Sequence, residues 1–329
     1  MESRSHSLFT ALGHTWTHLT VVVVGGRYVP FDSRPQSGVP ATTVHNAYPR
    51  MWQDANAQAV REGTASTRGG SPPADRPLWF ARSSGLTSPA VVPLFWLGDQ
   101  LHSWDRNDGL ASVVIAMLSS GLSGHALTHS DTGGYTTIKL PPIPRLPLPS
   151  YTRDLELLQR WSELSIFTAF FRTHEGSAPS LNVQPYDLEA LSHFKRCAEL
   201  FVSLAPYRTK LMSEARDRGW PLVRPLWLHH EDDPATRDLE LQFLEGESLL
   251  VAPVLAPHAT RVRAYLPAGN WRRAFAPNGT VTTSLGGWFD LDAPIGEPAA
   301  LVRLDESTGR PPEELVPFLE AAGRGRKSS

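Results

Sequence analysis

Cysteine is nearly absent from this chain, which has one, Cys197, in 329 residues. A lone cysteine cannot form a disulfide within the chain, so the sequence indicates no disulfide framework and no oxidising compartment. Cys197 falls in a helical period from Ser192 to Leu200, which predicts an inert core thiol. The N-terminus lacks the basic start, apolar centre and small-residue cleavage site of a signal peptide. We therefore expect a cytoplasmic protein.

Long apolar runs and charge of one sign are also lacking. No apolar run reaches the ~20 residues that cross a bilayer. Lys and Arg number 31 against 33 Asp and Glu, a formal net charge of -2, so no global field draws the chain to nucleic acid or to an anionic membrane. We expect neither as a partner. With 41% hydrophobic and 19% charged residues, the composition is that of a globular protein.

Several catalytic motifs are missing as well. The sequence has no Gly-x-Ser-x-Gly elbow, no phosphate-binding loop, no dinucleotide-binding glycine fingerprint and no Cys/His spacing typical of a metal site. These absences disfavour serine hydrolases, nucleotide enzymes and zinc enzymes. Tryptophan, by contrast, is abundant, with ten residues. Tryptophan lines many carbohydrate sites, although it fills protein cores more often.

A repeated order of short apolar segment, polar cluster and helix is present. Pro77–Ala81 runs into Arg82, Val91–Leu97 runs into Asp99, and Pro221–Leu228 is a further apolar segment. Helices are expected over residues 110–118, 152–168 and, broken at Pro206, 187–215. This order predicts parallel strands joined by crossover helices. The polar clusters then lie at the C-terminal ends of the strands, where a (β/α)8 barrel has its active site.

After residue 236 the pattern changes to short alternating segments, which predict a small antiparallel β domain. The expected strands are Ser248–Val254, Val262–Leu266, Trp271–Phe275, Val281–Ser284 and Ala299–Leu304. Asn278-Gly279, between the third and the fourth, is a hairpin signal. Residues 306–329 finish in Gly, Arg, Lys and Ser and are expected to form a flexible tail.

Asp99 is the first candidate catalytic residue. The apolar strand before it brings its carboxyl to the expected barrel mouth, and apolar neighbours such as Trp96 raise a carboxyl pKa, as a general acid requires. An N-cap or turn aspartate is an equally weighted alternative. Arg82, which ends the preceding strand, could hold a carboxylate or a substrate oxygen in a bidentate fork. A surface salt bridge is its alternative.

A second polar group comprises His129, Asp131 and Tyr135 around two glycines, which allow a sharp turn beside a ligand. His and Asp are metal-ligand types, but one His-x-Asp loop supplies too few ligands, so we expect no metal site. His174 begins a similar loop and is either functional or a satisfied structural histidine. His229-His230, which precedes three acids, is expected in a solvated loop.

Three motifs in these clusters resemble glycoside hydrolase family 31, and within it the bacterial-type sulfoquinovosidases. They are Phe95-Trp96-Leu97-Gly98-Asp99-Gln100, His129-Ser130-Asp131-Thr132-Gly133-Gly134-Tyr135-Thr136 and Phe171-Arg172-Thr173-His174-Glu175-Gly176. The resemblance runs from about Gly26 to about Asp305. It implies an α/β fold: the later strands of a (β/α)8 TIM barrel over residues 21–233, then a small antiparallel β-sandwich domain over 236–305. Residues 1–20 do not resemble the family and are expected to form a disordered lead.

In chemical terms the resemblance implies a retaining α-glycosidase with two aspartates, one a nucleophile and the other an acid/base. Asp99 matches the acid/base. The nucleophile position is occupied by Val24, and the glutamate position near it by Arg27. A valine side chain cannot attack carbon, and Asp32 is a poor substitute because it lies beyond the strand end.

The resemblance also implies which residues bind the substrate. Arg82 and His174 match sugar-contacting residues, and Gln100 belongs to the acid/base motif. Tyr135 matches a tyrosine that helps to hold a sulfonate, and Asp131 matches an acid at the barrel mouth that supports the site. Neither a metal nor an organic cofactor is implied. The expected partner is a small carbohydrate, an α-glycoside, with a homo-oligomer left open.

The first half of the family enzyme and its nucleophile have no counterpart in this sequence. We therefore expect a truncated and impaired hydrolase of α-glycosides, with sulfoquinovosides as the favoured substrates. Two alternatives stay open. One is a non-catalytic sugar-binding pseudoenzyme that kept the pocket. The other is an α-glucosidase or α-xylosidase, against which Tyr135 argues.

Overall fold

The computed structural model describes residues 38, 44–45, 47–67, 77–140, 150–276 and 280–324. The chain divides into two compact units, Met1–Pro77 with Ser83–Val92, and Leu78–Arg82 with Pro93–Ser329. Three features expected from the sequence lie outside the described residues: the lead over residues 1–20, the expected nucleophile position at Val24 and the Asn278-Gly279 turn.

The first unit is described mainly through helix α4 (Tyr48–Thr67) and the short 3-10 helix η2 (Ser88–Ala90). The side-chain amide of Gln53, which is buried, donates to the carbonyl oxygen of Ser83 at 2.6 Å. This bond fastens the helix to the second segment of the same unit.

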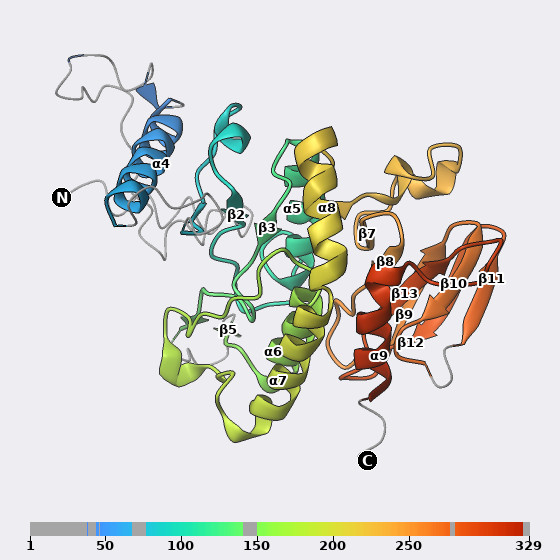
Figure 1. Ribbon diagram of the computed structural model, residues 1–329. Helices are drawn as coiled ribbons and strands as arrows, with labels where there is room; N and C mark the ends of the chain where they lie inside the picture. The colour runs from blue at the N-terminus through green and yellow to red at the C-terminus, as the bar shows by residue number, and fades with distance from the viewer. Residues whose placement is uncertain are drawn as a thin grey trace. The chain divides into compact units, whose positions relative to one another are not determined.

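A parallel three-stranded sheet begins the second unit. Its strands are β1 (Phe80–Ala81), β2 (Leu94–Trp96) and β3 (Thr128–His129), in that order across the sheet. Figure 1 labels the neighbouring strands β2 and β3. Helix α5 (Leu110–Leu122) connects β2 to β3, which is the expected crossover. Beyond β3, the amide of Ala169 donates to the carbonyl oxygen of Thr128 at 3.2 Å. The segment after helix α6 therefore lies beside β3.

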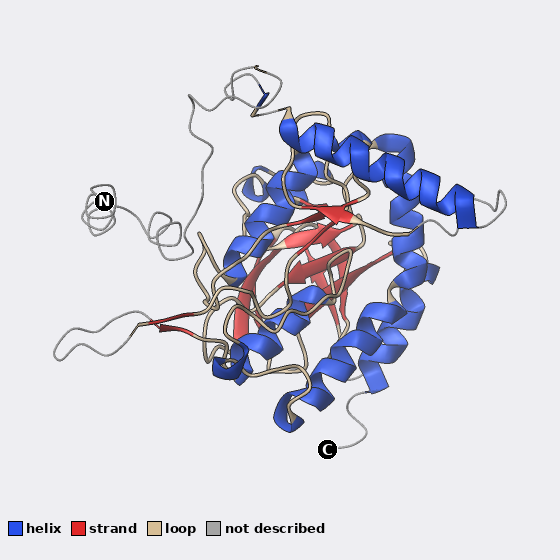
Figure 2. Ribbon diagram, turned by 90° about the vertical axis from the view of Figure 1, so that its left-hand side faces the viewer, coloured by secondary structure: helices blue, strands red, loops and turns tan. Residues whose placement is uncertain are grey.

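Helices α6 (Leu155–Ser165), α7 (Leu188–Ser203) and α8 (Ala205–Arg218) follow in the chain. The carboxylate of Asp154 caps α6 by accepting from the Leu157 N–H at 2.8 Å. The expected break at Pro206 is confirmed: this proline lies in the first turn of α8, where its missing N–H is not needed. Figure 2 shows the strands of this unit flanked by its helices.

Smaller elements complete the helical part. A two-stranded antiparallel sheet pairs β4 with β5, and four 3-10 helices lie between the larger elements. Their bounds are β4 (Ile138–Lys139), β5 (Ser150–Tyr151), η3 (Pro179–Leu181), η4 (Leu226–Leu228), η5 (Pro234–Thr236) and η7 (Glu313–Leu315).

Two antiparallel sheets form the C-terminal part of the second unit. The larger has the order β11-β10-β13-β8-β7-β6, and the smaller pairs β12 with β9. Their bounds are β6 (Val223–Arg224), β7 (Phe243–Glu245), β8 (Leu249–Ala252), β9 (Arg261–Leu266), β10 (Gly269–Arg273), β11 (Val281–Ser284), β12 (Gly287–Asp292) and β13 (Ala299–Leu304). Each of the five expected strands overlaps one of these. Tyr265, Trp271 and Leu301 belong to a buried core that both sheets share.

The segment Pro221–Leu228 differs from the expectation of a further parallel strand. Its strand residues, β6, pair antiparallel with β7, so that Val223 lies opposite Glu245. The buried guanidinium of Arg224 binds the Glu214 carboxylate at 2.6 Å, which fixes β6 against helix α8. The sequence pattern missed β7 because this strand has only three residues, one of which is Glu245.

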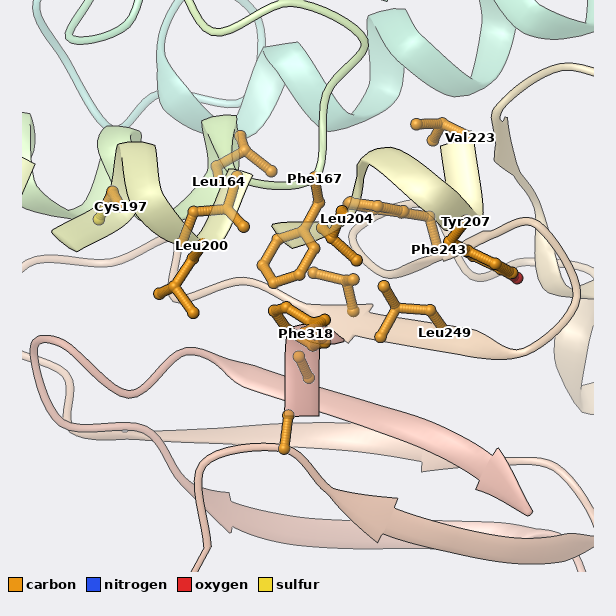
Figure 3. Close-up of a cluster of buried hydrophobic side chains, with 14 of the residues drawn as sticks. Leu164, Phe167, Cys197, Leu200, Leu204, Tyr207, Val223, Phe243, Leu249 and Phe318 are labelled. Carbon is orange, nitrogen blue, oxygen red and sulfur yellow. The ribbon is translucent and has the colours of Figure 1, made fainter. Parts of the chain in front are cut away.

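The C-terminal tail expected over residues 306–329 is corrected by helix α9 (Val316–Arg324). Phe318 is fully buried, and its ring centroid lies 6.0 Å from that of Phe167. Figure 3 shows both side chains in one cluster with residues of α7, α8, β7 and β8. Apolar residues at helical spacing, Leu315, Phe318 and Leu319, outweigh the polar composition that suggested a tail.

Candidate active site

The candidate site is built where the strands of the parallel sheet end. Arg82 follows β1, and Asp99 follows β2 after a turn at Gly98, whose φ of +99° favours glycine. Nη1 of Arg82 lies 3.1 Å from Oδ2 of Asp99, and the two side chains are 57% and 24% exposed. The sequence-predicted pair is therefore brought together, with the carboxylate facing solvent and held by the guanidinium.

A second, buried ion pair lies at the end of β3. Asp131 is fully buried and pairs with the guanidinium of Arg172, which comes from the segment after α6. Burial raises the pKa of Asp131 to about 6, an effect that Arg172 opposes and that the nearby Asp99 reinforces. The Asp131 carboxyl therefore changes its protonation state at a pH only slightly below neutrality.

Arg172 also orders its aromatic neighbours. Its Nε donates to Nε2 of the buried His129 at 3.2 Å, and its guanidinium carbon lies 5.1 Å from the ring centroid of Phe80 and 5.4 Å from that of Trp96. Burial, with the Arg172 charge, lowers the pKa of His129 to about 4. His129 is thus neutral near pH 7 and accepts a hydrogen bond from Arg172. The sequence singled out His129, but it missed the organising role of Arg172.

Tyr135 and His174 are adjacent at the same end of the sheet. Their ring centroids are 4.7 Å apart in an edge-to-face arrangement. His174 is exposed, and its Nδ1 accepts from the Gly176 amide at 3.2 Å. In the neutral ring the proton therefore lies on Nε2, which leaves a donor for a ligand.

Gln100, for which a substrate contact is expected, lies in the turn that carries Asp99. It is buried, and its side-chain amide donates to the carbonyl oxygen of Leu97 at 2.8 Å. This bond closes the turn that carries Asp99. In the structure Gln100 shapes the loop rather than facing solvent.

Arg153 is a residue that the sequence analysis did not select. It is fully buried, and it donates to the carbonyl oxygens of Val183 at 2.8 Å and His174 at 2.9 Å. Gly133 has a φ of +93°, and a Cβ there would lie 2.6 Å from Cδ of Arg153. The close approach explains one glycine of the Gly133-Gly134 pair. Arg153 was missed because nothing in its local pattern shows that distant carbonyls converge on it.

His229 and His230 correct the expectation of a solvated loop. Both are half-buried, and Nη1 of Arg224 lies 3.0 Å from Nε2 of His229. The His229 ring packs edge-to-face on Trp220. Burial, with Arg224, lowers the pKa of His229 to about 4. These histidines are therefore structural.

Val24, where the resemblance led us to expect the nucleophile position, lies outside the described residues. Within the described ranges, no three His, Cys, Asp or Glu side chains gather as a metal-binding group. In the same ranges no helix combines the length and apolarity that a membrane crossing requires.

Comparison with known proteins identifies the family to which these motifs belong. Residues 16–212 match the model of the glycosyl hydrolases family 31 TIM-barrel domain, and residues 219–305 match that of the family 31 C-terminal domain. The chain belongs to glycoside hydrolase family 31. The expected resemblance is confirmed, and the fold joins a TIM-barrel domain to a C-terminal domain of mostly antiparallel sheet.

Relatives within family 31 include two sulfoquinovosidases. That of Agrobacterium fabrum is 38% identical over 292 residues, which cover 88% of this chain and 41% of the relative. That of Escherichia coli is 38% identical over 281 residues, which cover 85% and 38%. A family 31 sulfoquinovosidase from E. rectale, solved with an aza-sugar inhibitor, has a TM-score of 0.76 at 31% identity and covers 94% of this chain and 44% of that one. The chain thus spans less than half the length of these relatives.

Proposed function

We propose that this chain carries the acid/base part of a retaining α-glycosidase site that accepts α-sulfoquinovosides. The observation that carries the proposal is the position of Asp99, solvent-facing at the end of β2 and bound to Arg82 at 3.1 Å. The 38% identity to two sulfoquinovosidases supports the substrate class. We further infer that the parallel strands β1 to β3 and the segment after α6 are later strands of a (β/α)8 barrel.

In the proposed reaction Asp99 first gives its proton to the glycosidic oxygen while the bond from that oxygen to the anomeric carbon breaks. A nucleophilic carboxylate forms the new bond to the same carbon. In the second half Asp99 takes a proton from a water molecule, whose oxygen bonds to the anomeric carbon while the bond from that carbon to the nucleophilic carboxylate breaks. The chain has Val24 where the nucleophile belongs. We therefore expect it to hydrolyse glycosides very slowly by itself.

Substrate selection is assigned to the side chains around Asp99. Arg82 can donate to sugar oxygens, and His174 presents an exposed ring with a donor at Nε2. Tyr135 is held against that ring and can donate its hydroxyl to a sulfonate oxygen. The ion pair of Asp131 with Arg172 lies beneath these side chains and provides a polar surface at this end of the sheet.

A titration of the purified chain with sulfoquinovose and with glucose, followed by calorimetry, tests the assignment. Sulfoquinovose is expected to bind at least about tenfold more tightly than glucose. Arg82→Ala should weaken sulfoquinovose binding, and Leu285→Ala, which changes an exposed side chain in the turn between β11 and β12, should not. Equal binding of the two sugars would support the α-glucosidase alternative instead.

A non-catalytic sugar-binding protein is the second candidate, and Val24 is the observation that favours it. The Arg82–Asp99 and Arg172–Asp131 pairs, which a bound sugar would need, are formed in the structure and support this candidate. A cooperative thermal transition that sulfoquinovose raises, together with no turnover even in a Val24→Asp variant, would favour this candidate.

A further inference from the structure

A cavity of about 540 Å3 lies in the C-terminal part of the second unit. One wall is the loop 238–242, another is the loop after β8, and a third is formed by β9 and by Trp288 of β12. We call this cavity the Trp288 groove. It shares no lining residue with the Arg82–Asp99 site, and nothing in the proposed function uses it.

Trp288 is the aromatic wall of the groove. Trp288 is 50% exposed, although a side chain as large and apolar as tryptophan is usually mostly buried. The edge of the Tyr265 ring packs against it with centroids 5.6 Å apart, and the Tyr265 hydroxyl donates to Oδ2 of Asp233 at 2.6 Å. The indole is therefore held in place while half of it stays open to solvent.

The loop 238–242 is bound to the sheet. The side chain of Gln242 pairs with the backbone of Tyr265 through two hydrogen bonds, both of 2.8 Å, one to the carbonyl oxygen and one from the amide. Nη2 of Arg106 donates to Oε2 of Glu240, which comes earlier in the same loop, at 2.5 Å.

The opposite loop, after β8, is equally well held. Oε1 of Glu156 accepts from the His258 amide at 2.7 Å, and Nη2 of Arg160 donates to the Ala259 carbonyl oxygen at 2.7 Å. The groove is thus formed before any ligand arrives, which lowers the entropic cost of binding.

The chemistry of the lining is mixed in a specific way. Leu241 and Leu255 are apolar, Asp238 carries an exposed carboxylate, and the Arg263 guanidinium lies over the Trp288 ring, 5.6 Å from its centroid. An aliphatic ligand would desolvate these charges without pairing them. An anion would meet the Asp238 carboxylate. A neutral ring with an apolar face and a rim of hydroxyl groups satisfies both parts of the lining.

We propose that the Trp288 groove is a second, non-catalytic saccharide site that takes a neutral pyranoside. The C–H face of the sugar stacks on Trp288. Its hydroxyl groups donate to the Asp238 carboxylate and accept from the Arg263 guanidinium. The site holds glycan chains at a distance from the Arg82–Asp99 site and does not depend on activity there.

Isomaltotriose is the probe, titrated into 15N-labelled chain. The indole N–H signal of Trp288, identified by its loss in Trp288→Phe, is expected to shift and to yield a dissociation constant on the order of 1 mM. Trp288→Ala should weaken binding at least about tenfold. The matched control, Leu285→Ala, removes a side chain that is 96% exposed and should leave binding unchanged.

The double variant Arg82→Ala/Asp99→Asn should bind isomaltotriose like the wild type, which separates this site from the proposed active site. If Trp288→Ala fails to fold, Asp238→Asn with the indole shift replaces it. An unshifted Trp288 signal at saturating isomaltotriose, or equal binding by the Trp288→Ala chain, would overturn the proposal. A signal that shifts only when another polypeptide is added would assign the groove to a protein partner and overturn it too.

Discussion

Two neighbouring carboxylates of the site occupy different surroundings. Asp99 stays partly exposed beside Arg82, whereas Asp131 is fully buried beside Arg172. The pKa of Asp131 is raised from 3.8 to about 6, with burial as the main cause. Because the unfolded chain releases this proton at lower pH, the folded chain binds the extra proton between about pH 4 and pH 6. The stability contributed by Asp131 therefore falls as the pH rises through that window.

Asp131→Asn removes this titration. We predict that the unfolding free energy of the wild type, minus that of the variant, falls by about 2–3 kcal/mol between pH 4 and pH 6.5. Urea denaturation at several pH values measures it, with Asp290→Asn, an exposed carboxylate, as the control. The subtraction is needed because His129 has its pKa lowered to about 4 and contributes with the opposite sign. A difference that is constant across the range would contradict the burial of a raised-pKa carboxyl.

The sequence predicted the positions of the site residues better than it predicted their burial and contacts. It placed Arg82 and Asp99 at strand ends, and the structure joins them. It could not tell that Asp131 would be buried, because its partner Arg172 lies 41 residues away along the chain. It also could not tell that Gln100 would turn back onto Leu97. Long-range contacts decide burial, and local pattern does not contain them.

Among the elements, the loops that carry Tyr135 and His174 depend on Arg153. We predict that Arg153→Lys lowers the unfolding free energy by about 2–4 kcal/mol, because a single ammonium cannot reach all the carbonyls that the guanidinium satisfies. Denaturation measures the loss, and hydrogen exchange should quicken at the Gly134 and Gly176 amides. Arg216→Lys, on an arginine that is 74% exposed, is the control. Equal stability of both variants would contradict the anchoring role.

Helix α9 is the second element whose importance can be measured. Phe318→Ala should cost ~3–5 kcal/mol, since it leaves a cavity between Phe167 and Phe275. Val316→Ala, at a position that is 37% exposed on the same helix, should cost less than about 1 kcal/mol. Thermal or urea unfolding of both variants measures the difference. If the two losses are alike, the helix does not complete the core.

Sequence prediction of elements succeeded where the helical period was long and failed where the elements were short. The apolar stripe over residues 152–168 identified α6. β12 was not predicted because its alternate residues Trp288 and Asp290 face solvent, which leaves it without a clear apolar pattern; it pairs with β9. α9 was not predicted because it has only nine residues, and the composition of the C-terminal segment is dominated by the polar residues that follow it.

For the whole molecule, the family assignment depends on the order of several motifs, since each motif alone has a structural alternative. The parallel sheet, the crossover helix and the antiparallel C-terminal sheets follow from the pattern of segments. The pattern does not contain the antiparallel pairing of β6 with β7, because the paired residues Val223 and Glu245 belong to segments that are separated along the chain.

The central claim is that Asp99 is an acid/base whose nucleophile position holds Val24. The direct measurement is turnover of 4-nitrophenyl and methyl α-sulfoquinovosides by the wild type, Val24→Asp and Val24→Asp/Asp99→Asn. We predict turnover near background for the wild type and a gain on the order of a hundredfold or more for Val24→Asp. Adding Asp99→Asn should slow the methyl glycoside far more than the nitrophenyl glycoside, because only the poorer leaving group needs its proton. Rapid wild-type turnover that Asp99→Asn leaves unchanged would contradict the claim.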